Sequence, residues 1–224
     1  APVISQKWSE GKFDELRDLY QFFTKWTLLF SIPLIFFFAY FSNDLMLLFG
    51  DEFVSGGVVL LILSIANFFN IAFGSTGVIL KMTGKHVKVL WMTFIHVSLT
   101  VLLMFILIPN YGLLGAALAV GIGKVFNNII HYVILYNEFK MLPYKAEFWK
   151  IFLVVLIGSG LLYFLFNSVF IGSGFYFLII YFLITVIIFL FMARAFCFSL
   201  EDRAIFNQLW LSVLSNVDSK KKIV

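Results

Sequence analysis

The residues of this sequence that could do chemistry are a few polar side chains embedded in long apolar runs. Lys124 is the only basic residue deep within such a run, and it follows Leu113 by about 16 Å along a helix axis. A charge at the centre of a membrane helix costs at least about 2.5–3.5 kcal/mol, so Lys124 is a candidate for function. The small and polar residues around it recur at helical intervals and form one stripe, made of Gly121, Lys124, Asn128 and His131. Small residues at intervals of four in the same run predict a surface where another helix can approach closely: Gly115, Ala119 and Gly123. Two interpretations follow: the stripe faces a water-filled cavity and attracts an anion, or Lys124 is held by helix carbonyls or a distant carboxylate.

Neighbouring apolar runs also carry polar residues at helical spacing. These are Asn67 and Asn70 in one run, and Thr93, His96 and Thr100 in the next. They suit hydrogen bonds between packed helices, worth about 0.6 kcal/mol each, or contacts with a substrate or an ion. An unperturbed histidine has a pKa near neutral, so His96 is either a candidate for proton coupling or a satisfied histidine of a bundle. Pro33 removes one backbone hydrogen bond from the first run and predicts a hinge there.

Motifs for catalysis, nucleotide binding and metal binding are absent from the sequence. No pair of carboxylates lies deep in an apolar run, where it could act as acid and base. Cys197 is the single cysteine and the three histidines are scattered, which argues against a metal site. Gly84 and Gly123 precede lysines but lack the rest of a phosphate-loop pattern. The sequence therefore predicts no enzyme and no cofactor.

The composition shows what kind of molecule must position these residues. Of the 224 residues, 62% are hydrophobic, 12% are charged and 30 are Phe. Soluble domains have about 45–50% apolar and about 25% charged residues. The polar surface is too small to cover a compact domain, so lipid must be part of the solvent. The composition excludes a water-soluble globule and predicts an all-α polytopic membrane protein.

Six apolar runs reach the length of about 20 residues that a membrane-spanning helix needs. They cover residues 22–41, 57–80, 87–108, 113–134, 148–169 and 175–193. Gly172, Ser173 and Gly174 divide the last two. Every basic residue except Lys124 lies in or beside the N-terminal stretch, the second loop, the fourth loop or the C-terminal stretch. By the positive-inside rule, both termini are predicted to be cytoplasmic.

The predicted organisation has five parts. They are an amphipathic cytoplasmic connector at 1–21, four spans at 22–137, a cytoplasmic loop at 138–147, a terminal transmembrane hairpin at 148–194 and an amphipathic basic tail at 195–224. The connector and the tail suit the membrane surface. The basic residues flank apolar spans, so nucleic acid is not an expected partner. No start methionine or signal peptide is present, so Ala1 is expected to lie inside a longer chain.

A series of local sequences, taken in chain order, carries a resemblance to a known family. They are Ala1-Pro2-Val3-Ile4-Ser5, Gly11-Lys12-Phe13, Leu16-Arg17-Asp18-Leu19-Tyr20, Ile32-Pro33-Leu34, Leu48-Phe49-Gly50-Asp51-Glu52-Phe53, Ile79-Leu80-Lys81-Met82-Thr83-Gly84-Lys85 and Ile108-Pro109-Asn110-Tyr111-Gly112-Leu113-Leu114-Gly115-Ala116-Ala117-Leu118-Ala119. Their order and spacing resemble polysaccharide or O-antigen-type flippases of the multidrug/oligosaccharidyl-lipid/polysaccharide exporter superfamily. The last sequence is the most specific, and the final hairpin matches in hydrophobicity and position.

The resemblance implies helices nine to fourteen of a two-lobed exporter. Such a protein moves a polyprenyl-diphosphate-linked oligosaccharide across the cytoplasmic (inner) cell membrane for polysaccharide biosynthesis. The implied partners are the lipid-linked glycan, membrane lipids, the missing N-terminal part of the same chain and polysaccharide-assembly enzymes. A diphosphate in hydrocarbon needs a basic, hydrated niche. The candidate substrate-binding residues are therefore Lys124, Asn128, His131, Asn67 and Asn70.

Two alternative functions are weighed against the flippase. One is a multidrug or organic-cation extruder of the same superfamily, which the sequence around Asn110 and the terminal hairpin disfavour. The other is a membrane-embedded glycan polymerase, which needs deep or loop carboxylates and long catalytic loops. The outer loops here are short, and no acidic residue lies deep in a span.

Overall fold

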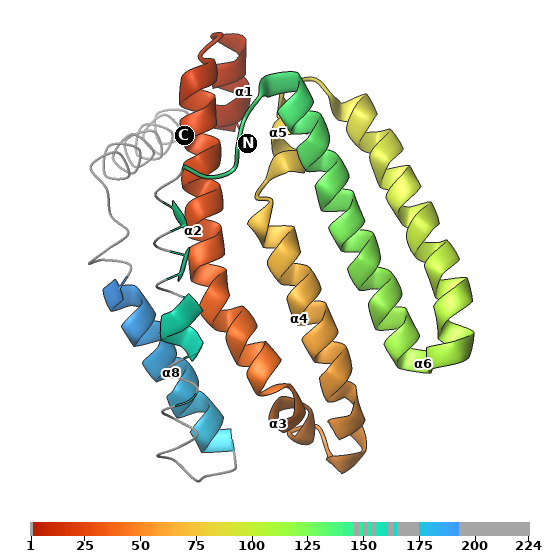
Figure 1. The fold of residues 1–224 in the computed structure, drawn as a ribbon. Helices are drawn as coiled ribbons and strands as arrows, with labels where there is room; N and C mark the ends of the chain where they lie inside the picture. Colours follow the sequence, from red (N-terminus) through yellow and green to blue (C-terminus); the bar gives the residue numbers. More distant parts are fainter. Residues whose placement is uncertain are drawn as a thin grey trace, which may run out of the picture.

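The computed structural model describes residues 2–145, 148–149, 152–153, 156–160, 164 and 175–192. All regular elements in this part of the chain are helices (Figure 1). In chain order they are α1 (Pro2–Ser9), α2 (Phe13–Tyr40), α3 (Ser42–Leu47), the 3-10 helix η1 (Asp51–Gly56), α4 (Gly57–Ala72), α5 (Thr76–Met82), α6 (His86–Phe139) and α8 (Phe175–Met192). The predicted turn at 172–174 and the tail at 195–224 lie outside the described residues.

The apolar helices confirm an all-α membrane protein. Within the described ranges, three helical segments are long and apolar enough to cross a membrane: Phe13–Tyr40, Asp51–Ala72 and His86–Phe139. A helix of α6's 54 residues would be about 80 Å long if straight, whereas a hydrocarbon core is about 30 Å thick. The total of six spans and the cytoplasmic placement of both termini stay predictions.

Helix α6 is a hairpin of two antiparallel arms (Figure 1). The backbone reverses at Gly112, where φ is 54° and ψ is −128°. A side chain is disfavoured at positive φ, so glycine suits this position. The first arm, residues 86–111, and the second arm, residues 113–139, correspond to the predicted spans 87–108 and 113–134. The sequence therefore placed both arms and the reversal between them correctly.

Small residues bring the two arms of α6 together. A Cβ atom on Gly115 would lie 2.2 Å from the Leu107 carbonyl oxygen, and one on Gly123 would lie 2.1 Å from Thr100 Oγ1. Ala119, midway between these glycines, is fully buried. Small side chains at intervals of four let helix backbones approach closely. The helix-packing surface that this spacing predicts is confirmed.

The predicted span 57–80 is not one helix, which corrects the sequence interpretation. Helix α4 ends at Ala72, the backbone turns at Gly74 with φ 67°, and α5 begins at Thr76. The segment contains no proline, but Gly74, Ser75 and Thr76 form a cluster that is typical of a turn, within an otherwise apolar run. Contacts with distant parts of the chain also stabilise the break, and they are described below.

Helix α2 joins the predicted connector to the first predicted span without interruption. It runs from Phe13 to Tyr40 and continues through Pro33, which is buried. The predicted boundary at residue 21 falls inside this helix, whose buried face begins at Leu16 and Tyr20 and continues into the apolar run. The placement of the connector at the membrane surface stays a prediction. The role of Pro33 as a hinge stays a prediction.

Buried side chains connect the helices at several levels of the molecule. One cluster joins α2, α5, both arms of α6 and the segment after α6, and consists of Leu16, Tyr20, Ile79, Leu80, Val89, Leu135 and Met141. Another joins α2 to Phe148 and includes Leu28, Leu29 and Ile32. A third packs α2 against α8 through Phe37, Phe41, Leu178 and Tyr181. Helix α4 lies between α2 and α6 and contacts both (Figure 1).

Candidate functional site

Lys124 lies in the second arm of α6 and reaches across to α4. Its Nζ atom donates a hydrogen bond to Asn67 Oδ1 at 3.0 Å, and its side chain is half-buried. Gly121 packs against α4 beside this contact, where a Cβ on Gly121 would lie 3.5 Å from that of Ala66, an ordinary van der Waals distance. The glycine of the predicted stripe thus lies in the interface through which Lys124 reaches its partner.

A second hydrogen bond links the same two helices one turn further along. Asn128 Nδ2 donates to Asn70 Oδ1 at 2.9 Å and to the carbonyl of Lys124 at 2.8 Å. Asn128 is buried, whereas Asn70 is exposed. The structure brings four predicted site residues together. We call these four, Asn67, Asn70, Lys124 and Asn128, the polar row.

The partner of Lys124 differs from both alternatives that the sequence left for a purely structural role. Within the described ranges Lys124 makes no ion pair. Its contact is the side-chain amide oxygen of Asn67, and not a main-chain carbonyl or a carboxylate. An ammonium group has three donors and the hydrogen bond to Asn67 uses one. An amide oxygen carries only a partial charge, so it satisfies a donor without neutralising the ammonium.

His131 and Asn127 lie beside the polar row but make different contacts. His131 is 7% exposed, and its ring lies 3.5 Å from the place of a Cβ on Gly77 of α5. Among the described residues, neither His131 Nε2 nor Asn127 Oδ1 has a hydrogen-bond partner. The two residues are four positions apart and share a helix face. His131 is therefore placed next to α5. Asn127, a half-buried residue whose Oδ1 atom is buried, was omitted from the predicted site.

His96 lies on the first arm and faces the second. Its Nε2 atom is 3.3 Å from the place of a Cβ on Gly123. The hydroxyls of Thr93 and Thr100 donate to the carbonyls of Val89 and His96 in their own helix, so they do not supply the bonds between helices that the sequence suggested. A role of His96 in proton coupling stays a prediction.

An apolar groove lies between α4 and the second arm, away from the polar row. Its volume is about 370 Å³. Ile62, Ile65 and Phe69 line it from α4, and Ile122, Val125 and Ile129 line it from α6. On each helix these residues occupy a different face from the polar row, because their positions differ in helical phase. The contact between α4 and α6 therefore has one polar and one apolar side.

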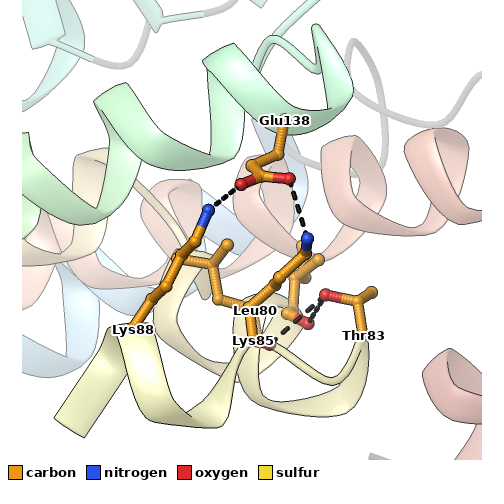
Figure 2. A network of polar contacts seen from close by, with 6 residues as sticks. Leu80, Thr83, Lys85, Lys88 and Glu138 are labelled. Atoms are coloured by element: carbon orange, nitrogen blue, oxygen red, sulfur yellow. Dashed lines mark hydrogen bonds and ion pairs between the residues drawn. The ribbon is translucent and has the colours of Figure 1, made fainter.

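An ion-pair cluster joins the far ends of the two arms of α6. Figure 2 shows Glu138 of the second arm between Lys85 and Lys88, at the start of the first. Lys85 Nζ lies 3.0 Å from one carboxylate oxygen, and Lys88 pairs with the other. Glu138 lies beyond the predicted span 113–134, and the hydrogen bonds from Lys88 and Lys85 lower the pKa of its carboxyl. The cluster holds the arms together at the end opposite Gly112.

Comparison with known proteins places the first part of this chain near a transporter family. The family model described as MatE matches residues 1–106, which is less than half of the 224 residues. The match covers α1 to α5 and most of the first arm of α6, and ends before Lys124. No match was found among curated proteins or solved structures. MatE proteins are membrane transporters and not enzymes, so the match is consistent with the exporter superfamily named above.

Proposed function

We propose that this chain is part of a membrane transporter that flips a lipid-linked oligosaccharide, carried on polyprenyl diphosphate, across the cytoplasmic membrane. The MatE match over residues 1–106 supports the transporter class. Lys124 contacts the side-chain amide of Asn67 instead of a carboxylate, and this observation supports the choice of an anionic substrate. A cation in an apolar run that pairs with no acidic group of the described residues favours an anionic solute.

The polar row can exchange its internal hydrogen bonds for bonds to a phosphate. The Lys124 ammonium can replace the Asn67 oxygen with a phosphate oxygen, because bonds between two charged groups are about twice as strong as neutral ones. The amides of Asn67 and Asn70 then offer N–H donors to the same anion. In this proposal Lys124, Asn67, Asn70 and Asn128 bind the diphosphate, and buried His131 lies at the edge of the site.

The distribution of acidic residues argues against the two alternatives. The sequence has no Asp or Glu between Glu52 and Glu138, which covers α4, α5 and nearly all of α6. An organic-cation extruder would gain from a carboxylate in its site, and a glycan polymerase would need one as an acid or base. The proposed partners are the lipid-linked glycan, membrane lipids, an N-terminal part of the same chain and polysaccharide-assembly enzymes, all at the inner membrane.

The test is replacement of Lys124 in the complete polypeptide, in the cell that encodes it. Lys124→Ala removes a charge-assisted hydrogen bond, and losses of this kind correspond to a decrease in transport of about tenfold or more. Lys140→Ala, which removes an exposed cation outside the polar row, is the matched control. Surface polysaccharide and membrane abundance are measured together. Unchanged export in Lys124→Ala would assign this lysine to packing and remove the main support for an anionic substrate.

A further inference from the structure

The break between α4 and α5 replaces regular helical hydrogen bonding with a turn. The amide of Thr76 donates to the carbonyl of Gly74 at 2.9 Å, whereas in a continuous helix it would donate to Ala72. The turn requires positive φ, which Gly74 adopts at 67°. The carbonyls of Ala72 and Phe73 therefore need partners from elsewhere in the molecule.

Two tyrosines from different parts of the chain supply these partners. Tyr20 of α2 donates its hydroxyl to the Phe73 carbonyl at 2.8 Å, and Tyr144, which follows α6, donates to the carbonyl of Ala72. Tyr20 is 3% exposed. The carbonyls freed by the break are thus bonded to hydroxyls that belong to other elements.

The same carbonyls would be bonded equally well without the break. In a continuous helix, Ala72 would accept from the amide of Thr76, and Phe73 would accept from the amide of Gly77. Each carbonyl exchanges a tyrosine hydroxyl for a backbone N–H, so neither arrangement leaves it without a partner. The local sequence allows the continuous form, because it contains no proline and Gly74 adopts negative φ as readily as positive φ. Gly74 and Gly77 lower its helix propensity, so the local sequence does not by itself favour joining.

Thr24 adds a second contact that favours the broken form. It is 1% exposed, and its Oγ1 atom lies 2.1 Å from the place of a Cβ on Gly74. Among the described residues, no hydrogen bond to this oxygen is present. Thr24 therefore occupies the space that only a glycine leaves open at the turn.

We propose that the segment 73–75 is a two-state hinge: the Tyr20 and Tyr144 hydroxyls hold it broken, and release of those hydroxyls lets α4 and α5 join into one helix. The hinge begins three residues after Asn70 of the polar row. Joining the helices redirects α5, against whose Gly77 the buried His131 packs. The inference that this movement changes access to the polar row rests on the proposed function. The two helix arrangements can be measured by themselves, without a transport assay.

Spin-label distances in the complete polypeptide in lipid bilayers test the hinge. After replacement of all native cysteines, Cys197 among them, labels are attached at Val58 of α4 and Val78 of α5, which are 49% and 40% exposed. A continuous helix separates the two positions by about 30 Å along its axis, and the broken form gives a shorter distance. The double variant Tyr20→Phe, Tyr144→Phe is expected to raise the ratio of the long to the short distance by about tenfold or more, as two hydrogen bonds are lost.

Two further variants make the result decisive. Tyr111→Phe removes a hydroxyl from an exposed tyrosine beside the Gly112 reversal and is expected to leave the ratio unchanged. Gly74→Ala places a Cβ at positive φ and against Thr24, so it is expected to favour the long distance even where the tyrosines are intact. Identical distance distributions in the double variant, Gly74→Ala and Tyr111→Phe would overturn the hinge. A shifted distribution with unaltered transport would retain the hinge and contradict only its role in the proposed function.

Discussion

The close contact at Gly115 allows a quantitative test of how the two arms of α6 pack. In Gly115→Ala, the new Cβ would lie 2.2 Å from the carbonyl oxygen and 2.5 Å from the carbonyl carbon of Leu107, and 2.9 Å from the amide of Ile108. All three are backbone atoms, which cannot rotate away as a side chain can. The arms must separate by roughly 1 Å to restore ordinary van der Waals contact.

The expected loss of stability follows from two opposing effects. Overpacking a tightly packed contact costs about 1–3 kcal/mol. Replacing a helical glycine with alanine recovers about 0.5–1 kcal/mol through the backbone entropy of the unfolded chain. The net destabilisation is up to about 2.5 kcal/mol, which corresponds to a fall of up to about 10 °C in the unfolding midpoint of a chain of this size.

Gly121→Ala is the matched control in the same arm. Its Cβ would lie 3.5 Å from that of Ala66, an ordinary contact, so only the entropic gain applies and the midpoint rises by about 1–4 °C. Both variants and the parent are unfolded by heating in the same detergent or lipid nanodiscs, with circular dichroism as the signal. A Gly115→Ala midpoint equal to or above that of Gly121→Ala would refute the packing argument.

Two more predictions concern the ends of the α6 arms. Glu138→Gln removes the carboxylate that pairs with Lys85 and Lys88, so the variant should unfold at a lower temperature at neutral pH. These lysines lower the pKa of the Glu138 carboxyl. The stabilisation is therefore fully present above the ordinary pKa of a glutamate and is lost as the pH falls through the lowered pKa of Glu138. An equal pH dependence of the parent and variant unfolding midpoints would contradict this prediction. Cysteines placed singly at Gly84 and Tyr111 should react with a membrane-impermeant reagent from opposite sides of the membrane, and labelling of both from one side would refute the predicted topology.

The predictions that succeeded depend on local properties of the sequence. Hydropathy and length predicted both arms of α6, since a segment that enters lipid must satisfy its own backbone polar groups. The spacing of Gly115, Ala119 and Gly123 predicted their packing surface, because the helical repeat places them on one face. The same repeat grouped Lys124 with Asn128 before any partner was known.

The predictions that failed depend on contacts between distant segments. The break at Gly74 is stabilised by Tyr20 and Tyr144, which are separated from their acceptors by 53 and 72 residues. No periodicity within α4 and α5 encodes those contacts. Burial of the first turns of α2 against α5 and α6 likewise depends on distant segments, and it places the predicted connector and the first apolar run in one helix.

The sequence by itself determined that this protein is an all-helical membrane protein with a lysine deep in an apolar run, because hydropathy and helical spacing are properties of each segment alone. Only the tertiary structure decided that Lys124 meets an amide, at Asn67 of a helix 57 residues away. That choice depends on the rotation of α4 relative to α6. Contacts across both helices, with Gly121 beside Ala66 among them, accompany this rotation, and no single segment contains both surfaces.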